Sequence, residues 1–306
     1  MSAQSPITNY QLPVANREVP EGGKSKLALY WPLTKPLQSG LLLATGLAGY
    51  MSARCPVFNV GSILGLAGSL FLAIAGSTVL NMWWDRDIDA KMGRTKKRPT
   101  SSGLVTDREV LRLGLILSVV GVGWAVAMGA LYGIIVFGGL FFDVVVYSMW
   151  LKRRTAWSIV WGGISGAMPI LAGRALGLGA VDWIGLTLAL GILFWIPTHT
   201  LTFSMKFEKD YAAACVPTFP STYGLGVTRA TIAISSVLAA FAMVLAGYGI
   251  GMAWGFLRLL GVLSAGLLML AVAITFKPSE RVNFGLFKYA SVYMLAAMIL
   301  VVLEVM

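Results

Sequence analysis

The chain has 306 residues and a mass of 32.7 kDa; 57% of its residues are hydrophobic, only 12% are charged, and its mean hydropathy is +0.78. Charged residues make up about a quarter of an ordinary soluble domain, so half of the expected polar surface is missing. This composition predicts a polytopic helical membrane protein and excludes a disordered chain, a disulfide scaffold and a nucleic-acid-binding domain.

Nine segments are long and apolar enough to cross a membrane, because a spanning helix needs about 20 mostly apolar residues. The sequence predicts them at residues 36–53, 60–84, 110–128, 131–150, 157–176, 183–205, 229–248, 253–275 and 285–304. Residues 1–30 are polar and contain prolines and glycines. We therefore expect a flexible cytoplasmic tail over 1–30 and one nine-helix transmembrane domain over 31–306.

Basic residues decide the orientation of these spans. With the N-terminus inside, 21 of the 24 Lys and Arg residues fall on one side of the membrane, and only Arg54, Arg174 and Arg258 fall on the other. Because cytoplasmic loops are rich in Lys and Arg, this asymmetry predicts a multi-pass protein of the cell (inner) membrane with a cytoplasmic N-terminus. Ten of the 13 acids share the basic side, which indicates that an anion binds there with the help of carboxylates.

The second segment ends in a dense run of acids and bases. If its helix continues, Asn81, Asp85 and Asp89 share one face, because positions four apart lie about 40° from each other around the axis. Asp87 then points elsewhere. Neighbouring carboxylates with no cation between them repel each other, and oxygen ligands at this spacing suit Mg²⁺ bound together with substrate phosphates. Further along, basic side chains provide donors for a diphosphate, namely Lys91, Arg94, Lys97 and Arg98.

A charged membrane-exit loop, in which the acids only pair with the many cations, is the competing interpretation of this pattern. Asn81 argues for a more specific role, because an amide inside an apolar run costs a few kcal/mol if it lacks a partner. A second and weaker acidic set, Glu208 and Asp210, follows the sixth segment. Four spans separate the two sets, so opposed across a bundle they could hold one metal–diphosphate unit between them.

The stretch from Asn81 to Pro99 resembles the first signature of the UbiA superfamily of intramembrane prenyltransferases. More narrowly, it is similar to the protoheme IX farnesyltransferase (heme O synthase) branch. The resemblance runs from about residue 31 to 300, and further similar stretches occur in the family's order at 33–36, 147–155, 162–169, 197–199, 209–220 and 286–289.

This resemblance implies a nine-helix bundle with a central cavity open to the cytoplasmic side and laterally to lipid. It also implies a Mg²⁺-dependent reaction: a polyprenyl diphosphate (farnesyl, geranyl or longer) ionises, and a hydrophobic acceptor such as protoheme attacks the allylic cation. A quinone precursor or a lipid-like alcohol is the alternative acceptor. A membrane transporter is the competing class of function, although a transporter is expected to carry acids near the bilayer midplane, where only Asp143 lies.

On this interpretation each candidate residue has a role. Asp85, Asp89 and Asp210 are the expected Mg²⁺ ligands, and Asn81 is a polar partner near the metal. The diphosphate is expected to contact Arg94, Lys152 and Arg153, whereas Lys97, Arg98 and Arg154 are equally well explained as charges that set topology. Aromatic faces attract cations and are poor nucleophiles, so the allylic cation is expected near Tyr147, Phe203, Phe207 and Tyr211. His199, the sole histidine, either contacts the acceptor or is a structural histidine.

Overall fold

The computed structural model describes residues 25–54 and 59–305, and within these ranges the chain forms helices and no strands. Most of the predicted tail, 1–24, lies outside the described residues. Its last part forms the short helix α1 (Lys26–Tyr30), which is followed by one 3₁₀ turn, η1 (Trp31–Thr34). The all-helical class predicted from the composition is confirmed.

Eight helices of the described part are long and apolar enough to cross a membrane. They are α3 (Val60–Trp84), α5 (Asp107–Met128), α6 (Ala130–Phe141) with its continuation η2 (Phe142–Leu151), α7 (Ser158–Leu178), α8 (Trp183–Lys206), α10 (Phe219–Ile250), α11 (Trp254–Phe276) and α12 (Glu280–Leu303). The first predicted span corresponds to α2 (Pro36–Ser52), which has 17 residues and is shorter than these eight. A multi-pass helical bundle is therefore confirmed, whereas the count of nine spans stays a prediction.

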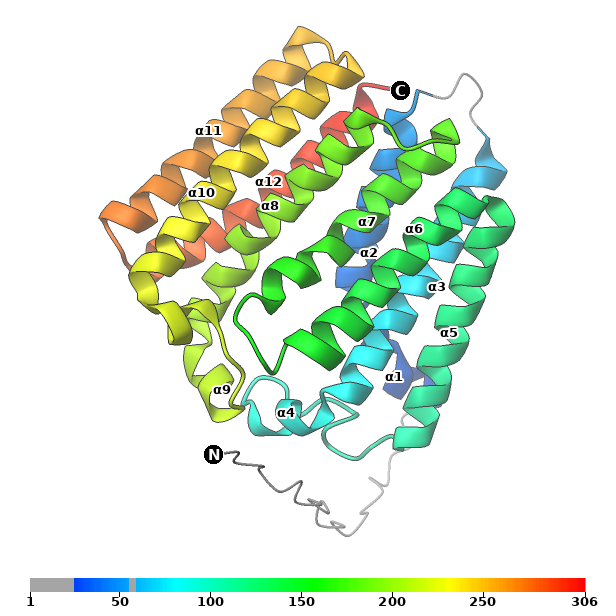
Figure 1. Ribbon diagram of the computed structural model, residues 1–306, viewed down its shortest axis with the longest axis vertical. Coiled ribbons are helices and arrows are strands. Elements are labelled where there is room, and N and C mark those ends of the chain that lie inside the picture. The colour runs from blue at the N-terminus through cyan, green and yellow to red at the C-terminus, as the bar shows by residue number, and fades with distance from the viewer. Residues whose placement is uncertain (1–24, 55–58, 306) are drawn as a thin grey trace, which may run out of the picture.

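Four helices form the centre of the bundle: α2 packs against α7, α7 against α8, α8 against α12, and α12 back against α2. Helices α3, α5 and α6 cover one side of this centre, and α10 and α11 cover the other (Figure 1). Two short helices, α4 (Arg86–Lys91) and α9 (Glu208–Ala213), lie together at one end of the bundle, and the C-terminus lies at the opposite end (Figure 1). The two acidic segments predicted from the sequence are therefore at the same end.

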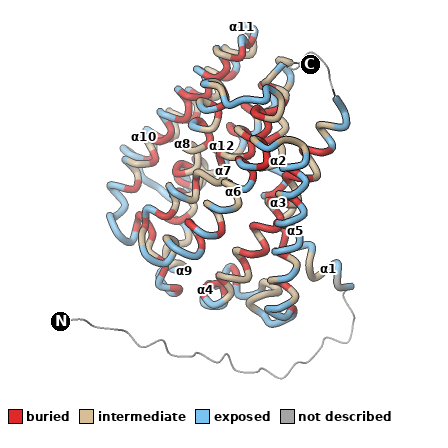
Figure 2. The backbone as a smooth tube through the Cα atoms, turned by 45° about the vertical axis from the view of Figure 1, so that its right-hand side comes forward, coloured by how far each residue is buried: buried red, intermediate tan, exposed pale blue. Residues whose placement is uncertain are grey.

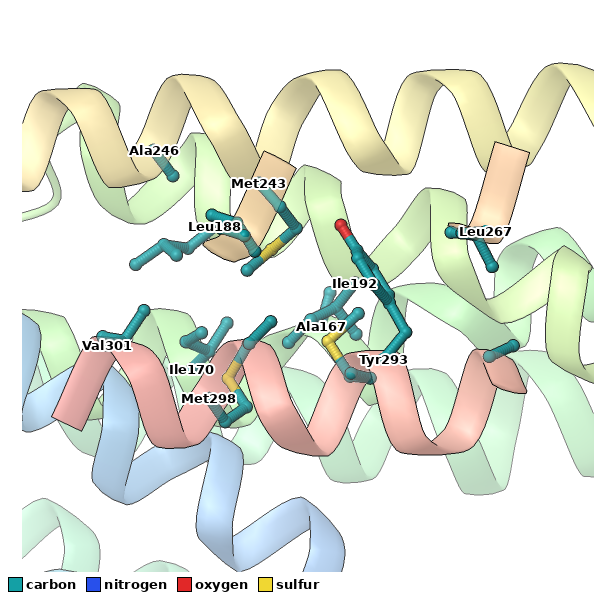
Figure 3. Close-up of a cluster of buried hydrophobic side chains, with 14 of the residues drawn as sticks. Ala167, Ile170, Leu188, Ile192, Met243, Ala246, Leu267, Tyr293, Met298 and Val301 are labelled. Carbon is teal, nitrogen blue, oxygen red and sulfur yellow. The ribbon is translucent and has the colours of Figure 1, made fainter. Parts of the chain in front are cut away.

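Buried residues face the interior of the bundle, and the outward faces of the long helices are mostly exposed (Figure 2). In the largest core, Leu188 and Ile192 of α8 lie among side chains of α7, α10 and α12, including Met243 and Tyr293 (Figure 3). Large apolar side chains such as Phe241, at 67% exposure, cover the outside. Such an apolar exterior is expected for helices that contact lipid.

Close packing of α2 and α7 depends on glycine. A Cβ atom at Gly173 would overlap the carbonyl oxygen of Gly46, and one at Gly49 would overlap that of Ile170. Small residues let helix backbones approach closely in a membrane, where apolar burial alone does not drive association. These glycines bring the first helix of the domain against the centre of the bundle.

Two elements differ from the sequence prediction. Helix α10 begins at Phe219 and not at 229, because Thr218 caps it by accepting from Ser221 N–H, and the chain bends at Gly224, which has a φ of 79°. The end of the fourth span is a π-helix, in which the Lys152 N–H bonds to the Tyr147 carbonyl oxygen at 2.8 Å. Such wide turns are rare and often occur at functional sites.

Candidate functional site

A cavity of about 550 Å³ lies between α2, α3, η2, α8 and α12, at the end of the bundle that carries α4 and α9. Its deeper wall is apolar and aromatic. Its charged lining combines four cations with three carboxylates, namely Lys35, Arg94, Arg98 and Lys152 with Asp85, Asp89 and Asp143. An apolar chamber with a charged mouth suits a ligand that has an anionic head and a hydrophobic body.

The first acidic segment follows a nearly continuous helical path. Asp85 is the C-cap of α3, and its backbone dihedral angles are not helical. The helical hydrogen bonds nevertheless continue through it, because the Asp85 N–H donates to the Asn81 carbonyl oxygen and the Asp89 N–H donates to the Asp85 carbonyl oxygen. Asn81, Asp85 and Asp89 consequently line the same cavity, while Asp87 is exposed outside it. The shared face predicted from the four-residue spacing is present.

Asp85 is buried and only partly satisfied. Its Oδ2 accepts from the Lys152 ammonium group at 2.5 Å. Its Oδ1 has no hydrogen-bond partner, and the Arg153 Nη2 atom is 3.9 Å away. Burial raises the pKa of Asp85 against the opposing effect of Lys152. The pKa of Lys152 is itself raised, because Tyr147 and Asp85 outweigh the effect of its burial.

Among the four cations of the cavity, Lys35 was not singled out from the sequence, and Arg98 was left open between a diphosphate donor and a topology charge. Arg98 lines the cavity and donates from Nη1 to Asp89 Oδ2 at 2.5 Å, and its role as a diphosphate donor stays a prediction. Lys35 joins η1 to α2 in the left-handed conformation, with a φ of 43°. Burial, together with the neighbouring Arg98 and Lys152 charges, lowers the pKa of Lys35 to about 8. Arg98 and Lys152 are thus close enough to Lys35 to disfavour its charged form.

A small polar network lies deeper in the cavity, on α3 and η2. Asp143 Oδ2 accepts hydrogen bonds from the Asn81 amide nitrogen at 2.6 Å and from the Ser77 hydroxyl at 2.5 Å. The Asn81 Oδ1 atom is buried without a partner. Asp143 is therefore the hydrogen-bond partner that a buried amide at position 81 requires. It engages the Asn81 side-chain nitrogen and leaves the side-chain carbonyl oxygen free.

The second acidic segment meets the first through the loop after α4. The Arg94 N–H donates to Asp210 Oδ2 at 3.3 Å. Below this contact, an apolar cluster joins the two loops; its buried members are Ile88, Met92, Ala214 and Val216, with Tyr211 packed against them. Asp210 does not line the cavity, but Arg94 and Tyr211 do, so Asp210 lies at the rim. The Arg94 guanidinium lies 5.0 Å from the ring centroid of Phe203 and 5.6 Å from that of Phe207.

Arg153 lies outside the cavity lining, although its Nη2 atom is within 3.9 Å of Asp85 Oδ1. It donates to both carboxylate oxygens of the exposed Asp87, at 2.6 and 2.7 Å, and does not line the cavity. These bonds lower the pKa of Asp87, outweighing the opposite effect of its partial burial. The pair of Arg153 and Asp87 therefore fits the competing interpretation, in which the acids of the exit loop only pair with nearby cations. The predicted contact of Arg153 with a diphosphate has no support from its position.

Aromatic side chains form the wall beyond the charged mouth. Tyr147 lines the cavity against Gly162, and the Lys152 ammonium group lies 5.6 Å from its ring centroid. His199, also lining the cavity, is stacked between Trp195 and Phe287. Of the predicted substrate-binding residues, Arg94, Tyr147, Lys152, His199 and Tyr211 therefore line one cavity.

No three His, Cys, Asp or Glu side chains of the described ranges are close enough to form a metal site by themselves. The cavity nevertheless holds two buried oxygen atoms without partners, Asp85 Oδ1 and Asn81 Oδ1. Carboxylate and amide oxygens are ligands for Mg²⁺, which is usually bound by one or two carboxylates together with substrate phosphates. The donor set therefore fits a Mg²⁺ ion that arrives with a diphosphate.

Residues 42–300 match the model of the UbiA prenyltransferase family. The chain is 39% identical over 277 residues to a protoheme IX farnesyltransferase from Archaeoglobus fulgidus, covering 90% of this chain and 95% of that one. Further relatives with the same name are 33% to 42% identical. The similarity extends over nearly all of the described bundle.

Two solved structures share the fold. One, described as digeranylgeranylglyceryl phosphate synthase, has a TM-score of 0.76 at 18% identity and covers 91% of this chain and 98% of its own. The other, a UbiA homolog from Archaeoglobus fulgidus bound to GPP and Mg²⁺, has a TM-score of 0.65 at 14% identity and covers 89% and 99%. At these identities the two structures establish the shared helical architecture.

Proposed function

Since the chain belongs to the UbiA prenyltransferase family and is a prenyltransferase, we propose that it transfers a polyprenyl group from an allylic prenyl diphosphate to protoheme IX in a Mg²⁺-dependent reaction. The name of its relatives supports farnesyl as the prenyl group and protoheme as the acceptor. The observation that carries the proposal is the meeting of two acidic helix ends, through Arg94 and Asp210, at the mouth of an apolar cavity.

The metal would be held by Asp85 and Asp89, with Asp210 at the rim and the free Asn81 oxygen beside them. When bound, Mg²⁺ would supply positive charge that stabilises the departing diphosphate. In its absence Asp85 and Asp89 each accept from a cation, Lys152 and Arg98. The charge of the cavity lining as a whole is nearly balanced, four cations against three carboxylates, so a multiply charged diphosphate needs an additional cation to bind.

The chain's cations bind and orient the diphosphate. The side chains of Lys152 and Arg98 are mostly buried, so water screens their charge weakly. Asp85 holds Lys152 in place, and Asp89 holds Arg98. Donors fixed before the reaction stabilise the charge that develops on the leaving oxygen without reorganising at that moment. The π-helix η2 positions Lys152, because Lys152 directly follows its last residue.

The apolar wall protects the allylic cation from water. Tyr147, Phe203 and Tyr211 line the cavity and offer aromatic faces that attract a cation without reacting with it. The Arg94 guanidinium lies 5.0 Å from the ring centroid of Phe203, and this contact supports the assignment of a cation-attracting role to that ring. Phe207 lies outside the cavity lining, next to Phe203, and its ring centroid is 5.6 Å from the Arg94 guanidinium.

We also propose that the protein lies in the cell membrane with its N-terminus and cavity mouth facing the cytoplasm. The strong bias of Lys and Arg toward the α4–α9 end supports this orientation. Two of the three cations at the opposite end are paired with acids there, Arg54 with Glu304 at 2.9 Å and Arg174 with Asp182 at 2.7 Å. Their charges are thus compensated locally and do not oppose the bias.

The test is to incubate the purified protein with labelled farnesyl diphosphate and Mg²⁺, separately with protoheme IX and with a quinone precursor, and to identify the products. We expect farnesylated protoheme, and no product when Mg²⁺ is chelated. Asp107→Asn is a suitable control variant, because Asp107 pairs with Arg86 outside the cavity. A prenylated quinone precursor alone would replace the proposed acceptor, and the absence of any Mg²⁺-dependent diphosphate release, as expected of a transporter, would refute prenyl transfer.

A further inference from the structure

His199 has both faces of its ring covered. Its imidazole is stacked on Trp195, with ring centroids 4.9 Å apart and planes at 20°, and on Phe287, at 4.5 Å and 23°. The indole Nε1 of Trp195 donates to the Ala290 carbonyl oxygen at 2.8 Å, which fixes that partner. Since His199 also lines the cavity, only the edge of the ring can meet a ligand.

The contacts of Ser291 favour the tautomer of His199 that carries its proton on Nδ1. The Ser291 hydroxyl donates its single proton to the Phe287 carbonyl oxygen at 3.0 Å, and the same hydroxyl oxygen is 3.2 Å from His199 Nδ1. With that proton on the Phe287 carbonyl oxygen, the Ser291 hydroxyl oxygen is the acceptor for Nδ1–H, and this is the tautomer on which the inference rests. In a neutral imidazole with a proton on Nδ1, Nε2 carries a free lone pair. Nε2 makes no hydrogen bond to any described residue.

A histidine in this state is prepared to bind a metal, because metal-ligating histidines donate the other ring N–H to a fixed acceptor. The surroundings specify which kind of metal. No second His, Cys or carboxylate completes a metal cluster among the residues described. A single nitrogen ligand of this kind therefore suits a metal that brings its own equatorial ligands, as the iron of a porphyrin does.

The neighbouring wall fits the rest of a porphyrin, which is flat, aromatic and acidic at one edge. Phe203 and Phe287 line the cavity beside His199. Phe284 lies outside the cavity lining, stacked on Phe287 with ring centroids 6.0 Å apart, and the exposed ammonium groups of Lys206 and Lys288 lie 3.7 and 4.6 Å from its ring centroid. An aromatic surface that ends in two cations complements a macrocycle whose carboxylates point toward the aqueous end.

We propose that His199 Nε2 is an axial ligand of the iron of the porphyrin acceptor and that Ser291 is a positioning residue for it. The proposal rests on the proposed function, and it adds to that function the atom by which the acceptor is held. His199 is then a substrate-binding residue of the acceptor side, separate from the Asp85 and Asp89 side, where the prenyl diphosphate binds.

The test is to titrate the purified full-length protein with ferric protoporphyrin IX and record its absorption and electron paramagnetic resonance spectra. We expect the spectrum of a histidine-ligated ferric heme in the wild-type protein and its loss in His199→Gly. Added imidazole should restore that spectrum in His199→Gly, because it can occupy the vacated space. Ser291→Ala should weaken binding by about tenfold or more, as loss of such a supporting hydrogen bond usually does. Metal-free protoporphyrin IX should bind wild type and His199→Gly equally.

Thr187→Ala is the matched control, because Thr187 is on the same helix, is partly exposed and outside the cavity lining, and bonds only to the Trp183 carbonyl oxygen. An unchanged heme spectrum in His199→Gly would overturn the proposal. Failure of the wild-type protein to bind ferric protoporphyrin IX would also overturn it. Diphosphate release from farnesyl diphosphate, measured in the same preparations, separates these failures from a failure of prenyl-transfer chemistry, because that release does not require His199.

Discussion

Lys152 and Asp85, which are 67 residues apart in sequence, form a buried ion pair at 2.5 Å between the end of η2 and the end of α3. The pair joins the fourth span to the first acidic segment at the cavity mouth. It leaves one Asp85 oxygen free, so the same carboxylate can hold the Lys152 side chain and still accept a further ligand.

Removing the lysine should therefore affect both stability and binding. In Lys152→Met, Asp85 stays buried without its cation, and breaking such a pair typically costs about 3–5 kcal/mol. We expect a lower unfolding temperature in detergent and a raised KM for the prenyl diphosphate. Arg154→Met is the control, since Arg154 is exposed and does not line the cavity. Equal KM values for the two variants would show that Lys152 does not contact the donor.

Asp143 should act by holding Asn81. In Asp143→Leu the Asn81 amide and the Ser77 hydroxyl lose their acceptor, and leaving buried polar groups unpaired costs about 1–3 kcal/mol each. We expect kcat to fall together with thermal stability. Asp143→Asn retains an acceptor oxygen and should keep most of both. If Asp143→Leu has the wild-type rate, the orientation of Asn81 is not needed for the reaction.

The pKa of Lys35 predicts a specific dependence on pH. With a pKa of about 8, Lys35 is charged below that pH and loses its charge above it. Because its positive charge favours binding of the diphosphate, kcat/KM for the donor should decrease as the pH rises through about 8; this ratio reports groups of the free enzyme. In Lys35→Arg the side chain stays charged throughout, and the decrease should disappear. A decrease that is identical in Lys35→Arg would assign the titration to another group.

A pair of glycine substitutions tests the packing of the bundle. An added methyl group at Gly173 overlaps the backbone of α2 at Gly46, whereas at Gly123, on the outside of α5, it meets no atom within 4 Å. Gly173→Ala should lower the unfolding temperature. Gly123→Ala should leave it unchanged or raise it, because alanine is favoured over glycine in a helix by about 1 kcal/mol. Equal effects would mean that α2 and α7 can separate at little cost.

Much of the bundle follows from local composition. The long apolar runs predict the long helices to within a few residues for most of them, because hydropathy and length alone decide whether a segment spans a membrane. The start of α10 was misplaced because residues 219–228 contain proline, glycines and hydroxyl side chains, and their helix depends on the Thr218 cap and not on apolar periodicity.

The site was predictable where helical periodicity applied. Asn81, Asp85 and Asp89 share a face because they are spaced four apart along nearly continuous helix. Lys97 and Arg98 are adjacent in a loop without any period, so the sequence could not show that Arg98 reaches Asp89 while Lys97 is exposed. The same limit applies to Arg153 and to Lys35, whose positions depend on contacts between segments far apart in the chain.

The central claim is that carboxylates from two separate helix ends act on one diphosphate, and a double-mutant cycle on Asp89 and Asp210 tests it most directly. Rates of diphosphate release from farnesyl diphosphate would be measured for Asp89→Asn, Asp210→Asn and the double variant. Residues that act as one unit give non-additive losses, so we predict that the double variant loses far less than the product of the two single losses. Losses that multiply, or a wild-type rate in Asp210→Asn, would contradict the shared site.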